Sequence, residues 1–177
     1  MSESTDGSVQ SISFAVPDGT YVVDPKMSSV TFRAKAFGVK WVHGKIPVAD
    51  GEITVSENHV SGKGQLSADR IDTGLKPRDW HLRSSHYLHT AQHPTIAVTI
   101  NNMSLVRGRH PCEVTVKSVV ARNELWLETV QSTNNELHVE ATMTLDRTVY
   151  PMLPPAAGVS RFAFLDITIV AQRSPVV

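Results

Sequence analysis

The sequence contains a single cysteine, Cys112, among 177 residues. One cysteine cannot form a disulfide within the chain, and a domain of this length does not need one to fold. The cysteine count therefore leaves the compartment open, and a reducing one is compatible with it. Because Cys112 stands between Pro111 and Glu113 at the start of a predicted strand, we expect a half-buried small side chain rather than a reactive thiol.

The chain also lacks a net charge. Its 17 lysine and arginine residues balance its 17 aspartate and glutamate residues. A balanced chain has no overall field that would draw it to nucleic acid or to an acidic membrane surface. We therefore expect no nucleic-acid partner.

Long apolar runs are missing as well. No stretch approaches the roughly 18 apolar residues of a membrane-spanning helix, so we expect no stable membrane insertion. Residues 1–16 are polar and lack the basic start and the continuous apolar run of a signal peptide. We expect a cytoplasmic protein, and a periplasmic or secreted one only if a leader was removed. The sequence leaves open whether the chain forms a homodimer.

The sequence does contain a series of short alternating segments. Apolar and polar residues alternate in runs bounded by Gly, Asn and Pro, which is typical of antiparallel strands with one face toward water. The clearest run is 137–145, which alternates without a fault. The other strands are expected at residues 21–24, 29–36, 45–55, 59–68, 95–106, 113–122, 125–130 and 161–172, with an interruption near 50–51 and a loop at 37–44.

These segments predict an all-β fold of about eight to ten strands, either a closed antiparallel barrel or a sandwich. The barrel is favoured because closure removes sheet edges, and an eight-stranded barrel can hold one small ligand. We assign residues 1–18 to a flexible arm or lead-in and residues 19–177 to one barrel domain.

Residues 67–94 interrupt the alternating pattern. This insert holds His81, His86, His89 and His93, and its apolar spacing suits a short helix or two helical turns. Pro94 is expected to stop the helix, because proline disfavours helical geometry in the residue before it. We interpret the insert as a helical lid over one end of the β-structure.

The insert carries a motif of the form TG-x3-RD-x-HLRS between two strands, and further segments match the same family in order. These segments are Tyr21–Asp24, Ser28–Phe32, Gly38–Gly44, Ile71–Gly74, Arg78–Asp79, His81–Ser84, His93–Pro94 and Leu145–Arg147. Over residues 19–172 the chain resembles the YceI-like family.

The resemblance implies an up-and-down, lipocalin-like β-barrel with a short helical insert at its mouth. Members of that family are associated with carrying polyisoprenoids, quinone-like molecules or other lipids inside the barrel. The chain departs from the family pattern at His86–His89, at Thr148–Met152 and at His43. These changes border the expected mouth, so they bear on which ligand is bound.

Our first hypothesis is therefore binding, storage or transport of a long apolar small molecule in the barrel interior. Each CH₂ group of a buried tail would contribute roughly 0.8 kcal/mol. An open alternative is a barrel whose interior is completely filled by its own side chains and which serves only as an interaction module. The residues expected to contact a ligand are Phe32, Ala34, Phe37, Trp41, Arg78, His81, Leu82, Tyr87, Leu88, Val139, Ala141, Met143, Phe162 and Phe164.

The polar group Arg78, Asp79 and His81 has three interpretations. Arg78 or His81 could bind a polar head group at the mouth, since guanidinium groups match phosphate oxygens. Alternatively, Asp79 accepts hydrogen bonds from lid amides while Arg78 pairs with a carboxylate such as Asp72. We favour this structural role, because a helical insert on a barrel rim leaves backbone donors that must be satisfied. The third interpretation, a catalytic His and Asp pair, is disfavoured because no Ser or Cys lies in a nucleophile motif.

The histidines support a second hypothesis, a metal-assisted or pocket-confined enzyme acting on an apolar metabolite. His86, His89 and His93 would share one face of a helix, and His43 could complete a site. The spacing lacks the HExxH form that would supply a general base, and a solvated polar lid face is the simpler interpretation. We therefore predict no metal and no cofactor.

Overall fold

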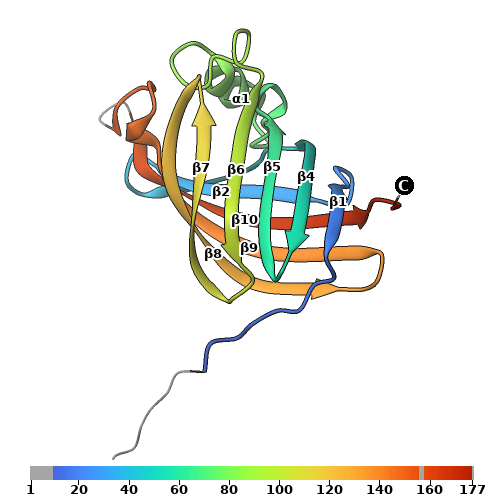
Figure 1. The fold of residues 1–177 in the computed structure, drawn as a ribbon. Coiled ribbons are helices and arrows are strands. Elements are labelled where there is room, and N and C mark those ends of the chain that lie inside the picture. The colour runs from blue at the N-terminus through green and yellow to red at the C-terminus, as the bar shows by residue number, and fades with distance from the viewer. Residues whose placement is uncertain (1–9, 156–157, 177) are drawn as a thin grey trace, which may run out of the picture.

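The computed structural model describes residues 10–155 and 158–176. These residues form a ten-stranded sheet with one α-helix and short 3-10 turns (Figure 1). The elements are β1 (Gly19–Val23), β2 (Ser29–Ala36), β3 (Lys40–Lys45), β4 (Val48–Ser56), β5 (His59–Ser67), η1 (Ala68–Arg70), α1 (Lys76–Arg83), β6 (Thr95–Ser104), β7 (Gly108–Val116), β8 (Val119–Ser132), β9 (Glu136–Asp146), η2 (Arg147–Val149) and β10 (Val159–Arg173).

Eight of the strands close into a barrel. They pair antiparallel in the order β1-β4-β5-β6-β7-β8-β9-β10, and β1 pairs with β10 to complete the ring. The remaining two, β2 and β3, continue the sheet beyond β10 as a hairpin. The prediction of an all-β, antiparallel, lipocalin-like barrel with a short helical insert is confirmed.

The first two strands lie end to end along one edge of β10. β1 pairs with residues 171–173 of β10, and β2 pairs with residues 159–168. Between them, the Ser28 hydroxyl donates to the Val170 carbonyl (3.2 Å) and accepts from the Val170 amide (3.0 Å). Because these buried backbone groups stay paired, the chain can leave the ring here and form the β2–β3 hairpin.

The structure corrects the predicted loop at residues 37–44. Residues 40–44 of this stretch belong to strand β3, which ends at Lys45 and pairs with β2 along its whole length. Trp41, His43 and Lys45 face outward while Val42 and Gly44 are half-buried, so the alternation is present over only five residues. In the prediction, the glycines near both ends of the stretch favoured a loop over this short alternating pattern.

The connection between β7 and β8 is a second correction. Residues 113–122 were expected to form one strand, but a turn at Lys117 and Ser118 divides them, and β8 then runs unbroken to Ser132. Both turn residues have positive φ (51° and 64°), although neither Lys nor Ser is a residue that signals such a turn. Likewise, the break expected near residues 50–51 is only a bulge within β4.

The insert contains the expected short helix, but the helix lies earlier in the insert than predicted. α1 ends at Arg83, and irregular turns continue from there to Pro94. Ser84 has extended backbone angles, and its hydroxyl donates to the His81 carbonyl (2.6 Å), which ends the helix ten residues before Pro94. None of the described helices has the length and apolar character needed to cross a bilayer.

Both ends of the barrel are covered. The insert lies over one end, and the segment before β1 crosses the other (Figure 1). In that segment Ser13 bridges to Val106, the Phe14 amide donates to the Leu105 carbonyl (2.8 Å), and Val16 is buried in the core. Residues 1–9 of the predicted arm lie outside the described residues.

Candidate functional site: an apolar cavity under a lid

The interior of the barrel contains a cavity of about 210 Å³. Aliphatic side chains from β1, β2, β4 to β10 and the segment between β3 and β4 form its wall. They are Val23, Val30, Ile46, Val48, Ile53, Val60, Leu66, Ile96, Val98, Ile100, Met103, Leu105, Val114, Val116, Leu125, Leu127, Val130, Leu137, Val139, Ala141, Met143, Leu145, Leu165, Ile167 and Ile169. On one side β4 and β5 also border the cavity with Asp50, Glu52, Gly62, Lys63, Gly64 and Gln65.

The choice of side chains explains why the interior is not filled. No aromatic residue is among the described residues that line the cavity, and the aliphatic side chains there bury less area than Phe or Trp would. On β5, Gly62 and Gly64 occupy lining positions between the outward-facing Ser61, Lys63 and Gln65. A Cβ atom at Gly62 would lie 2.8 Å from the Glu52 carbonyl oxygen, and one at Gly64 would lie 3.2 Å from the Asp50 carbonyl oxygen, so these glycines allow the backbone of β4 to approach closely.

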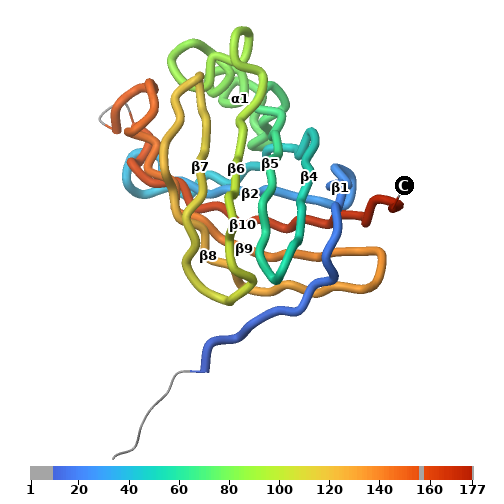
Figure 2. Tube along the Cα trace, in the orientation of Figure 1, coloured from blue at the N-terminus to red at the C-terminus, as the bar shows by residue number. Residues whose placement is uncertain are grey.

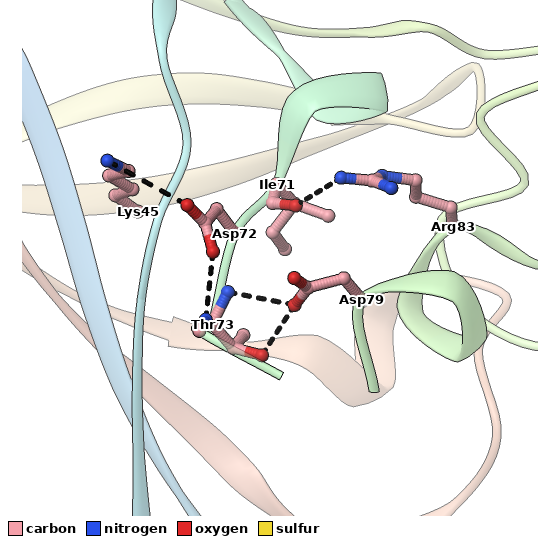
Figure 3. A network of polar contacts seen from close by, with 7 residues as sticks. Lys45, Ile71, Asp72, Thr73, Asp79 and Arg83 are labelled. Atoms are coloured by element: carbon pink, nitrogen blue, oxygen red, sulfur yellow. Dashed lines mark hydrogen bonds and ion pairs between the residues drawn. The ribbon is translucent and has the colours of Figure 1, made fainter. Parts of the chain in front are cut away.

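A polar network fastens the insert to the barrel wall (Figure 3). The Asp79 carboxylate accepts from the Thr73 amide (2.8 Å) and hydroxyl (2.5 Å), and it is buried. Asp72 accepts from the Gly74 amide (2.8 Å) and lies 3.8 Å from the Lys45 ammonium group on β3. Through these contacts α1 is held against residues 71–74, which in turn bridge to β3.

Two arginines add to this network. Arg83 donates to the Ile71 carbonyl (2.6 Å). Arg78 donates to the Thr73 hydroxyl and carbonyl, both at 2.7 Å, rather than pairing with Asp72 as predicted. Since two arms of its guanidinium group are committed to Thr73, the geometry favours the structural role of Arg78 over a head-group clamp.

Replacing Asp79 by alanine should lower the free energy of unfolding by about 2 kcal/mol, because the buried Thr73 donors lose a charged acceptor. Asp79→Asn keeps one acceptor oxygen and should lose about half as much. Urea unfolding measures both. The exposed Asp69, which makes no side-chain hydrogen bond among the described residues, supplies the matched control, Asp69→Ala. A loss at Asp79→Ala no larger than at this control would contradict the assignment.

A second segment, residues 147–153, completes the lid. The Leu153 amide donates to the His86 carbonyl (2.9 Å), and Lys117 donates to the carbonyls of Ser85 (3.2 Å) and Pro151 (2.6 Å). The Tyr150 hydroxyl donates to the Val114 carbonyl (3.0 Å), and burial raises the pKa of this phenol. These contacts tie the two halves of the lid to each other and to the rim.

Arg147 is the buried centre of that second segment. Its guanidinium group donates to the carbonyls of Ser160 (2.6 Å), Leu153 and Val159. Burial lowers the pKa of Arg147. The fork geometry of arginine suits three carbonyls that converge from different directions, which a lysine could not match.

The predicted ligand contacts fall into three groups. Val139, Ala141 and Met143 line the cavity, and Phe32 and Leu82 pack against the core around it. Ala34, Tyr87 and Leu88 are buried, while Arg78 and His81 lie on α1. Phe37, Trp41, Phe162 and Phe164 lie outside the barrel. For the predicted residues that face the interior, contact with a ligand stays a prediction.

The predicted inward orientation of Phe162 and Phe164 is wrong. On β10 the residues that line the cavity are Leu165, Ile167 and Ile169, so the two phenylalanines face the opposite side. Both faces of this strand carry apolar residues, and a shift of one residue exchanges them, so the pattern alone does not decide between them. Phe37 and Trp41 are outside because the hairpin that carries them leaves the ring.

Most of the cavity wall was missing from the predicted set. β6 and β8 supply Val98, Ile100, Leu125 and Leu127, whose alternation with polar neighbours is visible in the sequence. These positions could have been found by placing every strand of the barrel in register. The buried Cys112 is not on this wall, and burial raises the pKa of its thiol to about 11.

The histidines do not converge. His81 and His86 form one aromatic pair (ring centroids 6.0 Å apart), and His89 and His93 form another (5.8 Å). The last three do not share a helix face, because α1 ends before them. Within residues 10–155 and 158–176, no three His, Cys, Asp or Glu side chains gather as a metal would require. Among these residues the histidines thus do not form the metal site that the second hypothesis invoked.

Solved structures with the same architecture come from several bacteria. The BcnA protein of Burkholderia cenocepacia superposes with a TM-score of 0.70 at 12% identity, covering 84% of this chain and 98% of that one. A polyisoprenoid binding domain from Saccharophagus degradans, implicated in plant cell wall breakdown, gives a TM-score of 0.65 at 12% identity, covering 89% of this chain and all of the other. These likenesses establish the fold.

Sequence comparison points to the same group of proteins. A UPF0312 protein of Pseudomonas aeruginosa (strain LESB58) is 33% identical over 69 residues, which are 37% of this chain and 36% of the relative. Protein YceI of Escherichia coli O157:H7 is 32% identical over 73 residues, 40% of this chain and 38% of the relative. The chain thus matches little more than a third of the length of these curated relatives.

The family model of the YceI-like domain matches residues 21–171. With nearly the whole barrel inside that match, the chain belongs to the YceI-like domain family.

Proposed function

We propose that the chain binds one long apolar small molecule, of the isoprenoid type, inside the barrel. The observation that carries the proposal is the cavity, whose wall is made almost wholly of aliphatic side chains. The likeness in fold to a polyisoprenoid binding domain supports this class of ligand over others of equal apolarity. Storage or transport in the cytoplasm is the wider role we propose.

The energetics of the cavity suit a hydrocarbon chain. Apolar cavities of about 150 Å³ remain free of water and bind small apolar molecules. The cavity of about 210 Å³ is somewhat larger. A tail that enters it gains roughly 0.8 kcal/mol for each buried CH₂ group without needing a hydrogen bond. With the lid closed, the cavity has room for a short segment of a hydrocarbon chain. A longer chain must therefore extend out between the two parts of the lid.

The lid is the element that can open for a long chain. Its two halves, residues 84–90 and 147–153, are joined through the Leu153 amide and the Lys117 side chain. Separating them breaks a few hydrogen bonds at the surface and leaves every strand pairing of the barrel intact. Local opening of this kind costs less than global unfolding, and it would let a ligand enter at the end that α1 covers.

A series of prenols of increasing length tests the proposal. Displacement of a fluorescent apolar probe should show about a tenfold or larger gain in affinity from geraniol to farnesol, because the added isoprene unit is buried. The gain from farnesol to geranylgeraniol should be smaller, because the longer tail exceeds the closed cavity. Affinities that do not change with tail length would contradict binding in the interior.

A further inference from the structure

The turn of the β2–β3 hairpin exposes apolar side chains, although one edge of the Phe37 ring lies against Gly158. Phe37 and Val39 are 81% and 83% exposed, and the neighbouring Trp41 and Phe162 are each 42% exposed. The hairpin projects at the left of the molecule, next to the orange-red loop that follows β9 (Figure 2). We call Phe37, Val39, Trp41, Phe162 and Phe164 the hairpin patch.

The backbone conformation of the turn disfavours phenylalanine at position 37. Phe37 and Gly38 both have positive φ (51° and 71°), the combination of a type I′ turn. Asn, Asp and Gly are strongly preferred at the first of these positions, and a side chain such as phenylalanine costs about 1–2 kcal/mol in the left-handed region. A bulky aromatic residue at an exposed, unfavourable position indicates selection for something other than stability.

Positive charge lies along the hairpin beside the patch, while the β10 side carries Asp166 and, opposite Phe162, Asp146, which pairs with Arg161. Arg33 lies over the rings of Trp41 (5.7 Å) and Phe164 (5.4 Å), and the Lys35 ammonium lies over Trp41 (5.1 Å). From residue 25 to residue 49 the sequence has five lysines and arginines and no acidic residue. Within the described chain, Arg33, Lys35 and Lys40 form no ion pair. The overall charge balance therefore hides a local excess of positive charge.

From these observations we infer that the hairpin patch docks the protein on the surface of an anionic phospholipid bilayer. Phe37 and Val39, at the end of the hairpin, enter the region between head groups and acyl chains. Trp41 lies at head-group depth, where tryptophan is enriched in membrane proteins. Arg33, Lys35 and Lys40 contact lipid phosphates, each basic residue near an anionic surface contributing appreciably to binding.

The shape of the patch favours a bilayer over other partners. Val39 has no π face for stacking on a base, and the two most exposed apolar residues lie at a turn rather than along a groove that could follow a nucleic-acid backbone. The Phe37 amide donates to the Gly158 carbonyl (2.6 Å), so the patch adjoins the segment that follows the lid. The inference does not depend on what the cavity binds.

Co-sedimentation with vesicles tests the docking surface in the complete chain. Binding to phosphatidylcholine vesicles that contain phosphatidylserine should exceed binding to pure phosphatidylcholine vesicles, and it should weaken as salt is raised. The variant Phe37→Asn with Val39→Thr should bind the anionic vesicles about tenfold more weakly, or worse. Because asparagine is preferred in a type I′ turn, this variant should fold at least as well as the wild type.

Charge substitutions and controls complete the experiment. Lys35→Gln and Lys40→Gln should each weaken binding about fivefold. Val22→Thr and Lys63→Gln alter an exposed valine and an exposed lysine that lie on either side of Glu52, and both should bind like wild type. Loading of an apolar probe in solution should not change in the hairpin variants, which separates this proposal from the proposed ligand.

Three results would overturn the inference. The first is equal binding of wild type and the Phe37→Asn, Val39→Thr variant to anionic vesicles. The second is the absence of vesicle binding by the wild type, including the case in which it binds a single-stranded oligonucleotide instead. The third is loss of self-association, rather than of vesicle binding, in the hairpin variant, which would assign the patch to contact between copies of the chain.

Discussion

Replacing Ala141 by phenylalanine is expected to abolish the loading of an apolar chain while the barrel stays folded. Ala141 is buried on β9, between Ile167 of β10 and Leu127 of β8, and it lines the cavity. A phenylalanine ring there would project into the space that a ligand needs. Overpacking costs about 1–3 kcal/mol, but filling existing empty volume offsets much of it. Probe titration should show loading below about a tenth of wild type.

The control for this variant lies on the same strand. Thr144 faces outward from β9 opposite Phe164, so Thr144→Phe adds the same ring outside the barrel. It should load the probe like wild type, and thermal unfolding should show both variants folded. If Ala141→Phe loaded normally while folded, the ligand would have to bind somewhere other than the cavity.

Replacing Arg147 by alanine should have the largest effect on stability, a loss of about 3 kcal/mol or more in the free energy of unfolding. The side chain is 5% exposed and serves three carbonyl groups, those of Leu153, Val159 and Ser160. Each buried acceptor left without a donor costs about 1–3 kcal/mol. Urea unfolding measures the loss. Because these carbonyls shape the lid, release of bound probe should also become faster.

Two further variants give this prediction its controls. Arg147→Lys keeps the charge but not the fork, so it should fall between wild type and alanine. Arg107→Ala removes an exposed ion pair with Glu128 (2.8 Å) and should cost less than about 1 kcal/mol. A loss at Arg147→Ala as small as that at Arg107→Ala would show that the lid does not depend on its buried arginine.

The architecture was predictable because period-two alternation is strong wherever one face of a strand is buried. The run 137–145 alternates fully, and β9 occupies that place. The insert was recognisable because residues 67–94 break the alternation. In both cases local sequence and tertiary environment favour the same structure, so a pattern read over nine or so residues was sufficient.

Other features depend on interactions that lie far apart in the sequence. β10 is apolar on both faces, so only its pairing with β2 and β9 shows that Leu165 faces inward and Phe164 outward. The turn at Lys117 and Ser118 carries no sequence signal, and its positive φ values are imposed by the strands that it joins. The one-residue error on β10 therefore exchanged its two faces in the predicted site, while the residues predicted on β9 were placed on the correct face.

The existence of the cavity is also a property of the whole barrel. Whether an interior is filled depends on the summed volume of side chains from all eight strands. Gly62 and Gly64, for example, lie against the β4 backbone, so their small size allows two strands to approach closely and does not by itself create space. The prediction correctly placed three residues of the wall in the interior, Val139, Ala141 and Met143. It could not show that space remained between the side chains.

The central claim is that the barrel interior holds an apolar molecule. Native mass spectrometry of the wild-type chain, purified without detergent and incubated with geranylgeraniol, tests it directly beside Ala141→Phe. We predict a wild-type species heavier by one prenol molecule and the bare mass alone for the variant. The bare mass for the wild type, or the same added mass in both proteins, would contradict the account.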